Sequence, residues 1–388
     1  MCLCGCDTAD EQTESRVDSG PHDGGSELLD VDIPVVDAAA DGGAFVPAAP
    51  TLYRLTSAQY TQIIHDVFGA DLVIPPPEVD TPLHGFISIG TSEMTISPVA
   101  AERYEAVADS VSIEVFGDLE RARALVGCDA EDADCRLRAL TTLGRRLWRR
   151  PLADVELVVL MDVIEVVRPH VPHGMRALGA AVSTMLQSPH FLFRVQIGEP
   201  HPDREGLRRY TDWEMAERVS FLLWNTGPDE ALLDAAAAGE LTTEGGLSAQ
   251  VERLSTHPRA QAAVAGFFSE YLSLQRLDML QKDRRAFPLM SDTLGASMRA
   301  EIEAVLARLV FEDDTDLRAL LTTRQTYVDG ALAALYQLPG VAETAWAEHP
   351  DHGARAGLLT TAGFLALNAH NTVTSPTFRG KYIQNKLL

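Results

Sequence analysis

The segment RLTSAQYTQIIHDVFG, residues 54–69, carries the signals of an amphipathic helix at both of its ends. Thr56 is placed to cap the helix, and Gln59 stands at the capping-box position. Gly69 marks the end of the helix. Between the two ends, apolar residues recur at helical spacing: Tyr60, Ile63, Ile64, Val67 and Phe68. The segment therefore predicts a helix with one face in a hydrophobic core.

Two further helix starts carry comparable signals. Ser188 precedes Pro189, the arrangement of a serine cap followed by a proline in the first helical turn. Thr211 and Glu214 have the spacing of a capping box. Glu214 also lies four residues before Arg218, the spacing at which an acid and a base pair along a helix.

Apolar stripes with helical spacing continue along the chain. They comprise Met175, Leu178, Val182, Met185 and Leu186; Ala263, Val264, Phe267, Phe268, Tyr271 and Leu272; and Leu294, Met298, Ile302, Leu306 and Leu309. No run of alternating apolar residues bounded by turn residues predicts a strand. The predicted fold class is mainly α, a multi-helical array of two or three packed subdomains. His65 and Asp66 lie off the first stripe and are expected to be solvated.

Composition and charge limit the functional classes. The chain has 388 residues, of which 46% are hydrophobic, enough for sizeable cores. Its net charge of -24 argues against a nucleic-acid partner, because binding a polyphosphate requires a concentrated basic surface. No apolar run of 18 residues occurs, so no membrane-spanning segment is predicted.

Residues 1–50 differ from the rest of the chain. They contain eleven acidic residues and one basic residue, Arg16, among Gly, Ala, Ser and Pro. Such a segment cannot bury enough apolar surface to offset its ordering entropy. We predict a disordered tether between Asp7 and Pro50; a mobile terminus without a purpose is the alternative.

The first six residues, MCLCGC, suggest where the protein works. Leu3-Cys4-Gly5-Cys6 resembles a bacterial lipobox, which predicts that Cys6 carries lipid and that the protein is an extracytoplasmic lipoprotein of the cell envelope. The basic and apolar regions of a signal peptide should precede Leu3, so we expect that Met1 is an internal residue of a longer product. The alternative is a cytosolic protein whose cysteine-rich start binds metal.

Two other cysteines, Cys128 and Cys135, enclose the acidic segment CDAEDADC. In an oxidising compartment they are expected to form a disulfide, which would stabilise the fold by about 2 to 3 kcal/mol in the chain-entropy model. In a reducing cytosol the same residues would be two free thiols.

Six motifs in order carry a family resemblance. They are RLTSAQYTQIIHDVFG (54–69), RRLWRRPLADVE (145–156), LQSPHFLFR (186–194), AERVSFLLWNTGPDEALLDAAAAGEL (216–241), LSTHPRAQAAVAGFFSEYL (254–272) and RAGLLTTAGFLALNAHNTVTSPTFRG (355–380). Together they resemble the planctomycete-type domains of unknown function, the PSD domains and the cytochrome-associated PSCyt domains. The resemblance covers most of residues 51–388.

The resemblance implies an extracytoplasmic protein of the planctomycete and myxobacterial kind, with a c-type cytochrome or another envelope protein as partner. The chain departs from the family in ending at GKYIQNKLL, where the family usually continues, so we expect a missing C-terminal part. It also lacks the Cys-x-x-Cys-His motif that attaches haem c, so no cofactor is expected in this chain.

The sequence divides into five predicted parts. They are a truncated signal and acidic linker (1–50), a small helical module (51–118), a helical module containing RRLWRRPL (119–198), a central helical domain (199–340) and the start of a C-terminal module (341–388).

Clusters of basic residues and histidines give weak site signals. In RRLWRR, four arginines surround Trp148 and are expected to pair with carboxylates, with an anion site as the alternative: Arg145, Arg146, Arg149 and Arg150. The pairs His170/His173 and His349/His352 have three-residue spacing but no third ligand nearby in the sequence, so no metal site is predicted. His190 is expected to be a hydrogen-bonded core residue.

The strongest candidate site is the segment NAHNTVTSPTFRGKY near the C-terminus. It brings together Asn368, His370, Asn371, Thr374, Ser375 and Arg379. The amide groups at the start of a helix beginning at Ser375-Pro376, with a nearby arginine, can hold a carboxylate, a sulfate or a sugar hydroxyl. The alternative is that these groups cap the helix and satisfy the loop backbone.

Two functions follow as hypotheses. The first is a lipid-anchored helical scaffold or binding protein in an envelope assembly, with a cytochrome-linked redox role implied by the resemblance. The second is an extracytoplasmic enzyme acting on a polymer such as polysaccharide, with residues 368–379 in its cleft. The chain has no Gly-x-Ser-x-Gly, phosphate-loop or Gly-x-Gly-x-x-Gly motif to support the common hydrolase and nucleotide-binding readings.

Overall fold

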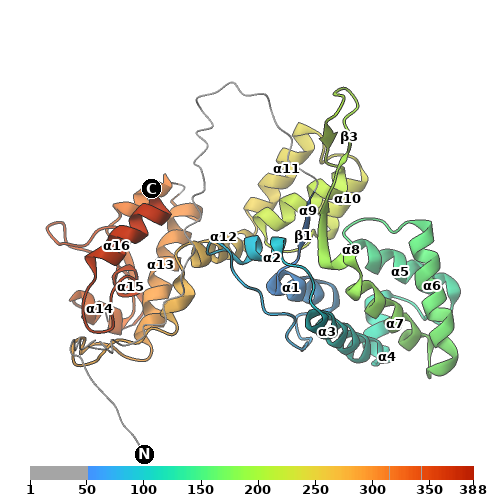
Figure 1. Ribbon diagram of the computed structural model, residues 1–388, viewed down its shortest axis with the longest axis horizontal. Coiled ribbons are helices and arrows are strands. Elements are labelled where there is room, and N and C mark those ends of the chain that lie inside the picture. Colours follow the sequence, from blue (N-terminus) through green and yellow to red (C-terminus); the bar gives the residue numbers. More distant parts are fainter. Residues whose placement is uncertain (1–50, 314, 342) are drawn as a thin grey trace, which may run out of the picture. The chain divides into compact units, whose positions relative to one another are not determined.

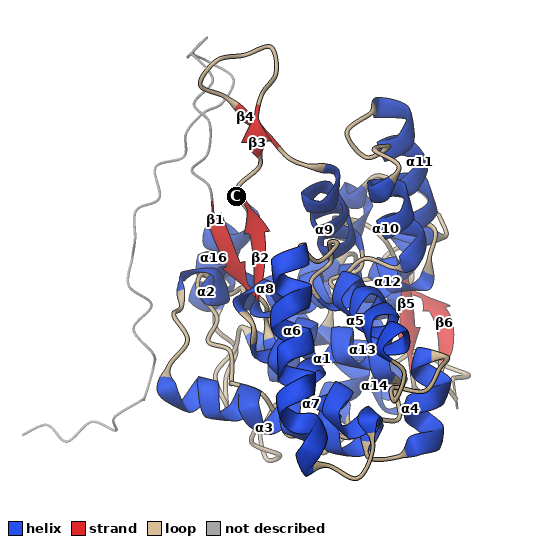
Figure 2. Ribbon diagram, turned by 90° about the vertical axis from the view of Figure 1, so that its right-hand side faces the viewer, coloured by secondary structure: helices blue, strands red, loops and turns tan. Residues whose placement is uncertain are grey.

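The structure of the chain, a computed structural model, describes residues 51–313, 315–341 and 343–388 (Figure 1). The predicted tether and the predicted lipidation site at Cys6 lie outside the described residues. Within the described part, 16 α-helices and three two-stranded antiparallel sheets form the regular structure. This arrangement confirms the mainly α fold class (Figure 2). The buried apolar side chains gather in three clusters.

Apart from Phe221, the first core lies among the elements between residues 51 and 196. These are β1 (Thr51–Arg54), α1 (Ser57–Phe68), α2 (Ile87–Glu93), α3 (Pro98–Phe116), α4 (Leu119–Val126), α5 (Ala133–Leu147), α6 (Asp154–Val167), α7 (Gly174–Gln187), α8 (Pro189–Leu192) and β2 (Phe193–Gln196). Helix α7 packs against α3, α5 and α6, and its predicted apolar stripe is buried. A Cβ atom added at Gly179 would lie 2.8 Å from Cβ of Phe116, so the absence of a side chain permits the close approach of α3 and α7.

Helix α1 has the ends that its sequence predicts. The Thr56 hydroxyl accepts the Gln59 backbone N–H at 3.1 Å, and Gln59 Oε1 accepts the Thr56 backbone N–H at 3.0 Å. Gly69, with φ of 115°, follows the last residue of the helix. The predicted apolar face is buried in the first core.

The short strands were not predicted. β1 pairs antiparallel with β2, with Thr51 opposite Gln196 and Arg54 opposite Phe193. Each strand has four residues, too few to show a readable alternation of apolar and polar positions. The pairing joins the two ends of the 51–196 region, and the Leu55 N–H continues it by donating to the Leu192 carbonyl at 2.8 Å.

The second cluster surrounds Trp224, whose Nε1 donates to the Leu254 carbonyl at 2.9 Å. Its helices are α9 (Asp212–Leu223), α10 (Glu230–Ala237) and α11 (Glu244–Ser255), with Ala260 contributed by α12 (Pro258–Tyr271). The small sheet of β3 (Glu199–Pro200) and β4 (Arg208–Arg209) precedes α9 in the chain. The cap signals at Ser188 and Thr211 are both confirmed.

The third cluster is built around α13 (Leu294–Phe311), and its predicted apolar stripe is buried. The remaining elements are β5 (Gln325–Val328), α14 (Gly330–Tyr336), β6 (Ala345–Glu348), α15 (Ala362–Leu367) and α16 (Pro376–Tyr382). Short 3-10 turns are at Arg168–His170, Leu274–Leu277, Leu317–Leu321 and Leu358–Thr360, and a π-turn at Ile383–Leu387. Phe267 was predicted to face a core from α12, but it is 51% exposed and stacks on Phe86.

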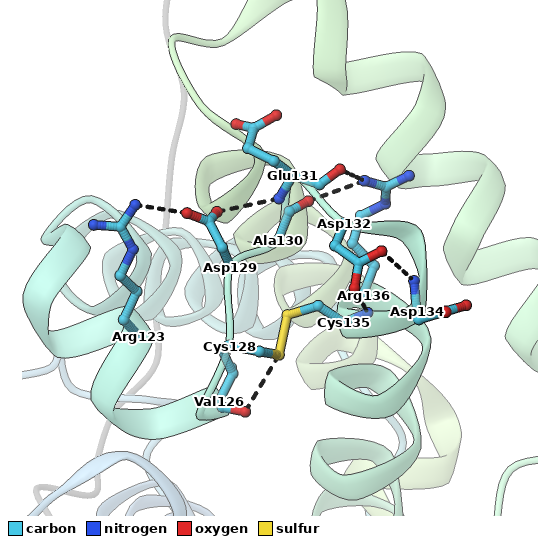
Figure 3. Close-up of a disulfide and its surroundings, with 10 residues drawn as sticks. All are labelled: Arg123, Val126, Cys128, Asp129, Ala130, Glu131, Asp132, Asp134, Cys135 and Arg136. Atoms are coloured by element: carbon cyan, nitrogen blue, oxygen red, sulfur yellow. Dashed lines mark hydrogen bonds and ion pairs between the residues drawn. A yellow bond between two sulfur atoms is a disulfide. The ribbon is translucent and has the colours of Figure 1, made fainter.

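The acidic loop before α5 contains the predicted disulfide between Cys128 and Cys135, whose Cα atoms lie 5.9 Å apart (Figure 3). Asp132 caps α5 by accepting backbone N–H groups, and Arg136 donates to the carbonyls of Ala130 and Glu131. The charged side chains of the loop thus hold its own backbone and the start of α5.

Candidate functional site

The arginines of RRLWRR at the end of α5 are paired with carboxylates, which confirms the pairing interpretation of this segment. The pairs are Arg145 with Glu230 and Asp234, Arg146 with Glu230, Arg149 with Glu217, and Arg150 with Glu156. Three of these four arginines reach acids between residues 217 and 234, so the segment connects the first core to the helices that follow it.

Arg149 makes more hydrogen bonds than the other three arginines. It is 1% exposed and has a positive φ of 58°, which turns the chain sharply after α5. Its guanidinium donates to Glu217 and to the backbone carbonyls of Leu147, His190, Phe191 and Phe193. Burial raises the pKa of Glu217, and the adjacent Arg149 opposes that rise. This satisfied buried pair joins three of the sequence motifs.

Two further contacts join α1 to the helices beyond residue 210. Arg259 Nη2 lies 2.6 Å from Asp66 Oδ1, and Arg259 Nη1 lies 3.0 Å from Asp66 Oδ2. Gln59 Nε2 donates to Asn225 Oδ1 at 2.7 Å. The expectation that Asp66 is solvated was therefore wrong, because its partner is 193 residues away in the sequence and no local pattern indicates it.

A cavity of about 460 Å³ lies where these segments meet. We call it the arginine cavity; it is lined by Tyr53, Gln59, Ser88, Arg194, Gln196, Met215, Arg218, Val219, Phe221, Leu222 and Asn225. Strands β1 and β2 and helices α1, α2 and α9 supply most of this lining. The cavity lies in the size range of small-molecule sites, roughly 300 to 1,000 Å³.

Arg194, the last residue of the motif LQSPHFLFR, places a cation in this cavity. Its guanidinium carbon lies 5.2 Å from the ring centre of Tyr53 and 4.7 Å from that of Phe221. Its Nε is buried and has no hydrogen-bond partner, and burial lowers the pKa of the side chain. Among the described residues, no carboxylate lies within ion-pair distance of Arg194. The aromatic rings therefore position the guanidinium without neutralising it.

Arg218 supplies a second cation. The spacing in the sequence predicted an ion pair with Glu214, but that pair is not formed among the described residues. Glu214 instead accepts backbone N–H groups of Ile197, Gly198 and Thr211. Arg218 donates to Gln196 Oε1 and to the Tyr210 hydroxyl, and its guanidinium carbon lies 4.4 Å from the Tyr210 ring centre. It is an exposed cation without a carboxylate partner within the described part of the chain.

Neutral polar groups complete the lining. Asn225, in left-handed conformation with φ of 55°, uses its Oδ1 to accept the Gln59 amide. Gln196 is buried beside Arg218, and Ser88 is exposed. Chemically, guanidinium groups can bind a carboxylate, and amide and hydroxyl groups can hydrogen-bond hydroxyl groups.

Sequence reasoning missed this site. Its residues come from positions 53 to 225, and the acids near Arg218 in the sequence, Glu214 and Glu217, indicated local pairing instead of a cavity. The available signal was the position of the polar residues inside the quoted motifs: Gln59 in the first, Arg194 at the end of the third, and Arg218 and Asn225 in the fourth.

The structure divides the predicted polar loop 368–379. Asn368 is buried and donates through Nδ2 to the Phe364 carbonyl at 3.0 Å. Ser375 is also buried and caps α16 by accepting the Phe378 N–H at 3.3 Å. The His370 ring lies 4.6 Å from that of Phe378. The contacts of Asn368 and Ser375 are those of the capping alternative.

The other loop residues occupy different surroundings. Asn371 is exposed, and its backbone carbonyl accepts the Asp283 N–H at 3.1 Å. Thr374 is exposed and forms an isolated bridge with Ala369. Arg379 is half-buried in the last turn of α16, a helix of seven residues. The loop therefore does not direct its six candidate side chains into one constellation.

The histidines have structural contacts. His349 is buried, and its ring centre lies 5.0 Å from that of Tyr336. Burial lowers the pKa of His349. His173 caps α7 through Nδ1. His190 was expected in a core but its side chain is 45% exposed, with Nδ1 3.2 Å from Arg150 Nη2. No group of three or more His, Cys, Asp or Glu side chains suited to a metal ion occurs among the described residues.

No helix in the described part of the chain combines the length and the apolar character needed to cross a membrane.

Three family models match the chain, each described as a protein of unknown function. They are PSD3 (DUF1587) at residues 53–117, PSD5 (DUF1595) at residues 135–196 and PSD4 (DUF1592) at residues 210–338. Comparison with curated proteins and with solved structures finds no match.

The matched ranges can be placed on the structure. The first two ranges supply most of the first hydrophobic core, and the third range supplies most of the other two clusters. The arginine cavity takes residues from all three ranges: Tyr53 from the first, Arg194 from the second and Arg218 from the third. The chain carries three planctomycete-type PSD domains of unknown function, in the order PSD3, PSD5, PSD4.

Proposed function

We propose that the protein is a lipid-anchored binding or scaffold component of the cell envelope. Its folded body binds a ligand with a carboxylate and hydroxyl groups, such as a uronic acid, in the arginine cavity. Arg194 and Arg218 hold the carboxylate, and the amides of Gln59 and Asn225 contact the hydroxyl groups.

One observation carries this proposal. Within the described residues, Arg194 and Arg218 line one cavity and neither has a carboxylate within ion-pair distance. The chain has 56 acidic residues and 32 Lys and Arg residues, so carboxylates are abundant as partners for arginine. A guanidinium keeps its charge at any physiological pH and bonds carboxylates through paired N–H groups. A ligand carboxylate in the cavity would give both groups an ionic partner.

The location outside the cytoplasm rests on two supports. The disulfide between Cys128 and Cys135 is a feature of proteins in oxidising compartments. The lipobox-like sequence ending at Cys6 predicts attachment to a membrane through lipid. On this proposal the membrane is reached through the lipid at Cys6, and the described helices form the body outside it.

The proposed protein partner is a c-type cytochrome or another envelope protein, as the family resemblance implies. Residues 1–388 contain no motif for covalent haem c attachment, so in this proposal the haem c belongs to that partner. The net charge of -24 would favour a partner with a basic surface and would speed their encounter at low salt.

The alternative, a polymer-acting enzyme with residues 368–379 in its cleft, has weaker support. Asn368 and Ser375 use their side chains for local bonds within α15 and at the start of α16. The sequence signals for a nucleophile are also lacking, as described above.

Thermal unfolding of the full-length protein tests the ligand proposal. Glucuronate is the probe, and glucose, which replaces the carboxylate with a neutral group, is the matched control ligand. A ligand present at 100 times its Kd stabilises the folded state by about 2.7 kcal/mol, which raises Tm by several degrees. We expect glucuronate to raise Tm and glucose to leave it unchanged, and the effect of glucuronate to shrink at high salt.

Two variants locate the effect. Arg218→Gln should abolish most of the Tm increase, whereas Arg138→Gln, which removes an exposed cation from α5, should keep it. Equal shifts with glucose and glucuronate, or a shift that survives Arg218→Gln, would contradict the proposal.

A further inference from the structure

A second cavity, separate from the arginine cavity, lies in the third hydrophobic cluster. We propose that it binds a single-chain amphiphile with a carboxylate head group, whose chain fills the apolar cavity and whose head pairs with Lys282 and Arg355. This inference does not depend on the proposed function of the arginine cavity.

The cavity has a volume of about 340 Å³ and walls that are almost entirely apolar. Its apolar residues come from the segment before α13, from α13 itself and from α14 and α15: Leu280, Ala286, Phe287, Pro288, Leu289, Met290, Leu294, Met298, Leu335, Ala362, Leu365 and Ala366. Removing an alkyl chain from water into such a space is favourable at about 0.8 kcal/mol for each buried CH2 group. The walls therefore fit an alkyl chain.

The walls can also adapt to a flexible chain. Met290 and Met298 line the cavity, and methionine side chains have unbranched, mobile thioethers that repack around ligands of irregular shape. Leu289 is 55% exposed while it also lines the cavity, so this apolar space reaches the protein surface there. An alkyl chain can enter from solvent without opening the core.

Two cations lie in the lining of this apolar space. Lys282 Nζ donates to the carbonyls of Ala369 at 2.8 Å and His370 at 3.0 Å, which leaves a third N–H for a ligand. Arg355 Nη1 donates to the Thr360 carbonyl at 2.6 Å. Its guanidinium carbon lies 4.6 Å from the ring centre of Tyr336. Both cations are held in place by neutral groups.

Neither cation forms an ion pair among the described residues, although the charge of Arg355 acts on Glu301 at longer range. Within the part of the chain that the structure describes, no carboxylate lies within ion-pair distance of Lys282 or Arg355. Burial and the charge of Arg276 lower the pKa of Lys282, and a bound carboxylate would restore its preference for the charged form. An apolar space with unpaired cations in its lining matches a molecule with an apolar chain and an anionic end.

The predicted polar loop contributes to this site through its backbone. Ala369 and Thr374 line the cavity, and the carbonyls of Ala369 and His370 hold Lys282. The sequence pattern had indicated an anion site among the side chains of this loop. The structure instead places the loop beside a cation of another segment, Lys282.

Isothermal titration calorimetry with three twelve-carbon ligands tests the inference on the full-length protein. The ligands are dodecanoate, dodecanol and dodecylamine, used below their aggregation concentrations. We expect dodecanoate to bind about tenfold more tightly than dodecanol, the effect of a charge-assisted bond, and dodecylamine to bind most weakly. Equal affinities for dodecanoate and dodecanol would overturn the assignment of the head group.

Variants separate this site from others. Lys282→Met should remove the preference for dodecanoate over dodecanol and Lys282→Arg should keep it, while Ala366→Phe should weaken the binding of both by filling the cavity. Two control variants should leave the binding of dodecanoate and dodecanol unchanged: Lys381→Met, at an exposed lysine of α16, and Arg194→Gln, in the arginine cavity. Binding that survives Ala366→Phe in a variant with an unchanged circular dichroism spectrum, or dodecanoate binding lost in Arg194→Gln, would overturn the inference.

Discussion

Arg149 and Arg194 are both largely buried arginines in the PSD5 range, but their surroundings differ. The guanidinium of Arg149 has a carboxylate partner, Glu217, and four carbonyl partners. The guanidinium of Arg194 lies between two aromatic rings, and its Nε has no partner. The first group is satisfied within the chain; the second faces a cavity with its charge unpaired.

The comparison separates a cation that the fold satisfies from one that we propose to bind a ligand. A buried charge costs several kcal/mol unless it is paired and hydrogen-bonded, and arginine cannot avoid that cost by losing its proton. Arg149 meets this requirement through the fold. Arg194 meets it only in part through its rings and the open cavity, so a bound anion would complete its environment.

The largest predicted effect is a loss of stability when the structural arginine, Arg149, is replaced. Arg149→Met leaves Glu217 buried without its cation, so we expect the free energy of unfolding to fall by about 3 to 5 kcal/mol. Urea unfolding followed by circular dichroism measures this change. The double variant Arg149→Met/Glu217→Leu should recover much of the loss, because it removes both charges together. A single variant as stable as the wild type would show that Arg149 does not hold the fold.

Glu301 extends the comparison to a buried acid, which, unlike arginine, can lose its charge by taking up a proton. Glu301 is 1% exposed and accepts hydrogen bonds from Thr326 at 2.6 Å and Tyr336 at 2.7 Å. Burial raises its pKa from 4.5 to about 7. Glu217 is paired with Arg149, whereas Glu301 has no ion-pair partner among the described residues and takes up a proton as the pH falls below about 7.

The sign of the pH effect follows from this raised pKa. The folded state binds the proton more tightly than the unfolded state, so the stabilisation is complete below about pH 4.5 and is lost as the pH rises to about 7. The loss is on the order of 3 kcal/mol. Urea unfolding of Glu301→Gln should show a shallower pH dependence than the wild type across this range. An identical dependence in both proteins would contradict the assignment.

The smallest predicted effect concerns the stability of Arg194→Gln. The substitution removes no ion pair, only the contacts with the rings of Tyr53 and Phe221. We expect the free energy of unfolding to change by about 1 kcal/mol or less. Urea unfolding beside Arg149→Met provides the contrast. A loss as large as that of Arg149→Met would place Arg194 with the structural arginines.

The local parts of the fold were predictable from the sequence, and the long-range parts were not. The caps of α1 at Thr56 and Gly69 depend on neighbouring residues, so the sequence indicated them directly. The partner of Asp66 is Arg259, and that of Arg149 is Glu217, 68 residues away. No spacing rule connects such positions.

The same reasoning applies to the candidate sites. Glu214 has the correct spacing to pair with Arg218, but its carboxylate is occupied by backbone N–H groups of residues 197 and 198. That competition leaves Arg218, which lines the arginine cavity, without an acidic partner among the described residues. The loop 368–379 has a suitable composition for an anion site, but burial of Asn368 and Ser375 directs their polar groups to the backbone.

The most direct test of the central claim is the affinity of Arg194→Gln for glucuronate, measured by isothermal titration calorimetry beside the wild type and Arg138→Gln. We predict that Arg194→Gln weakens binding about tenfold or more while its circular dichroism spectrum is unchanged, and that Arg138→Gln binds as the wild type does. Equal affinities in all three proteins, or no binding of glucuronate by the wild type, would contradict the claim that the arginine cavity is an anion-binding site.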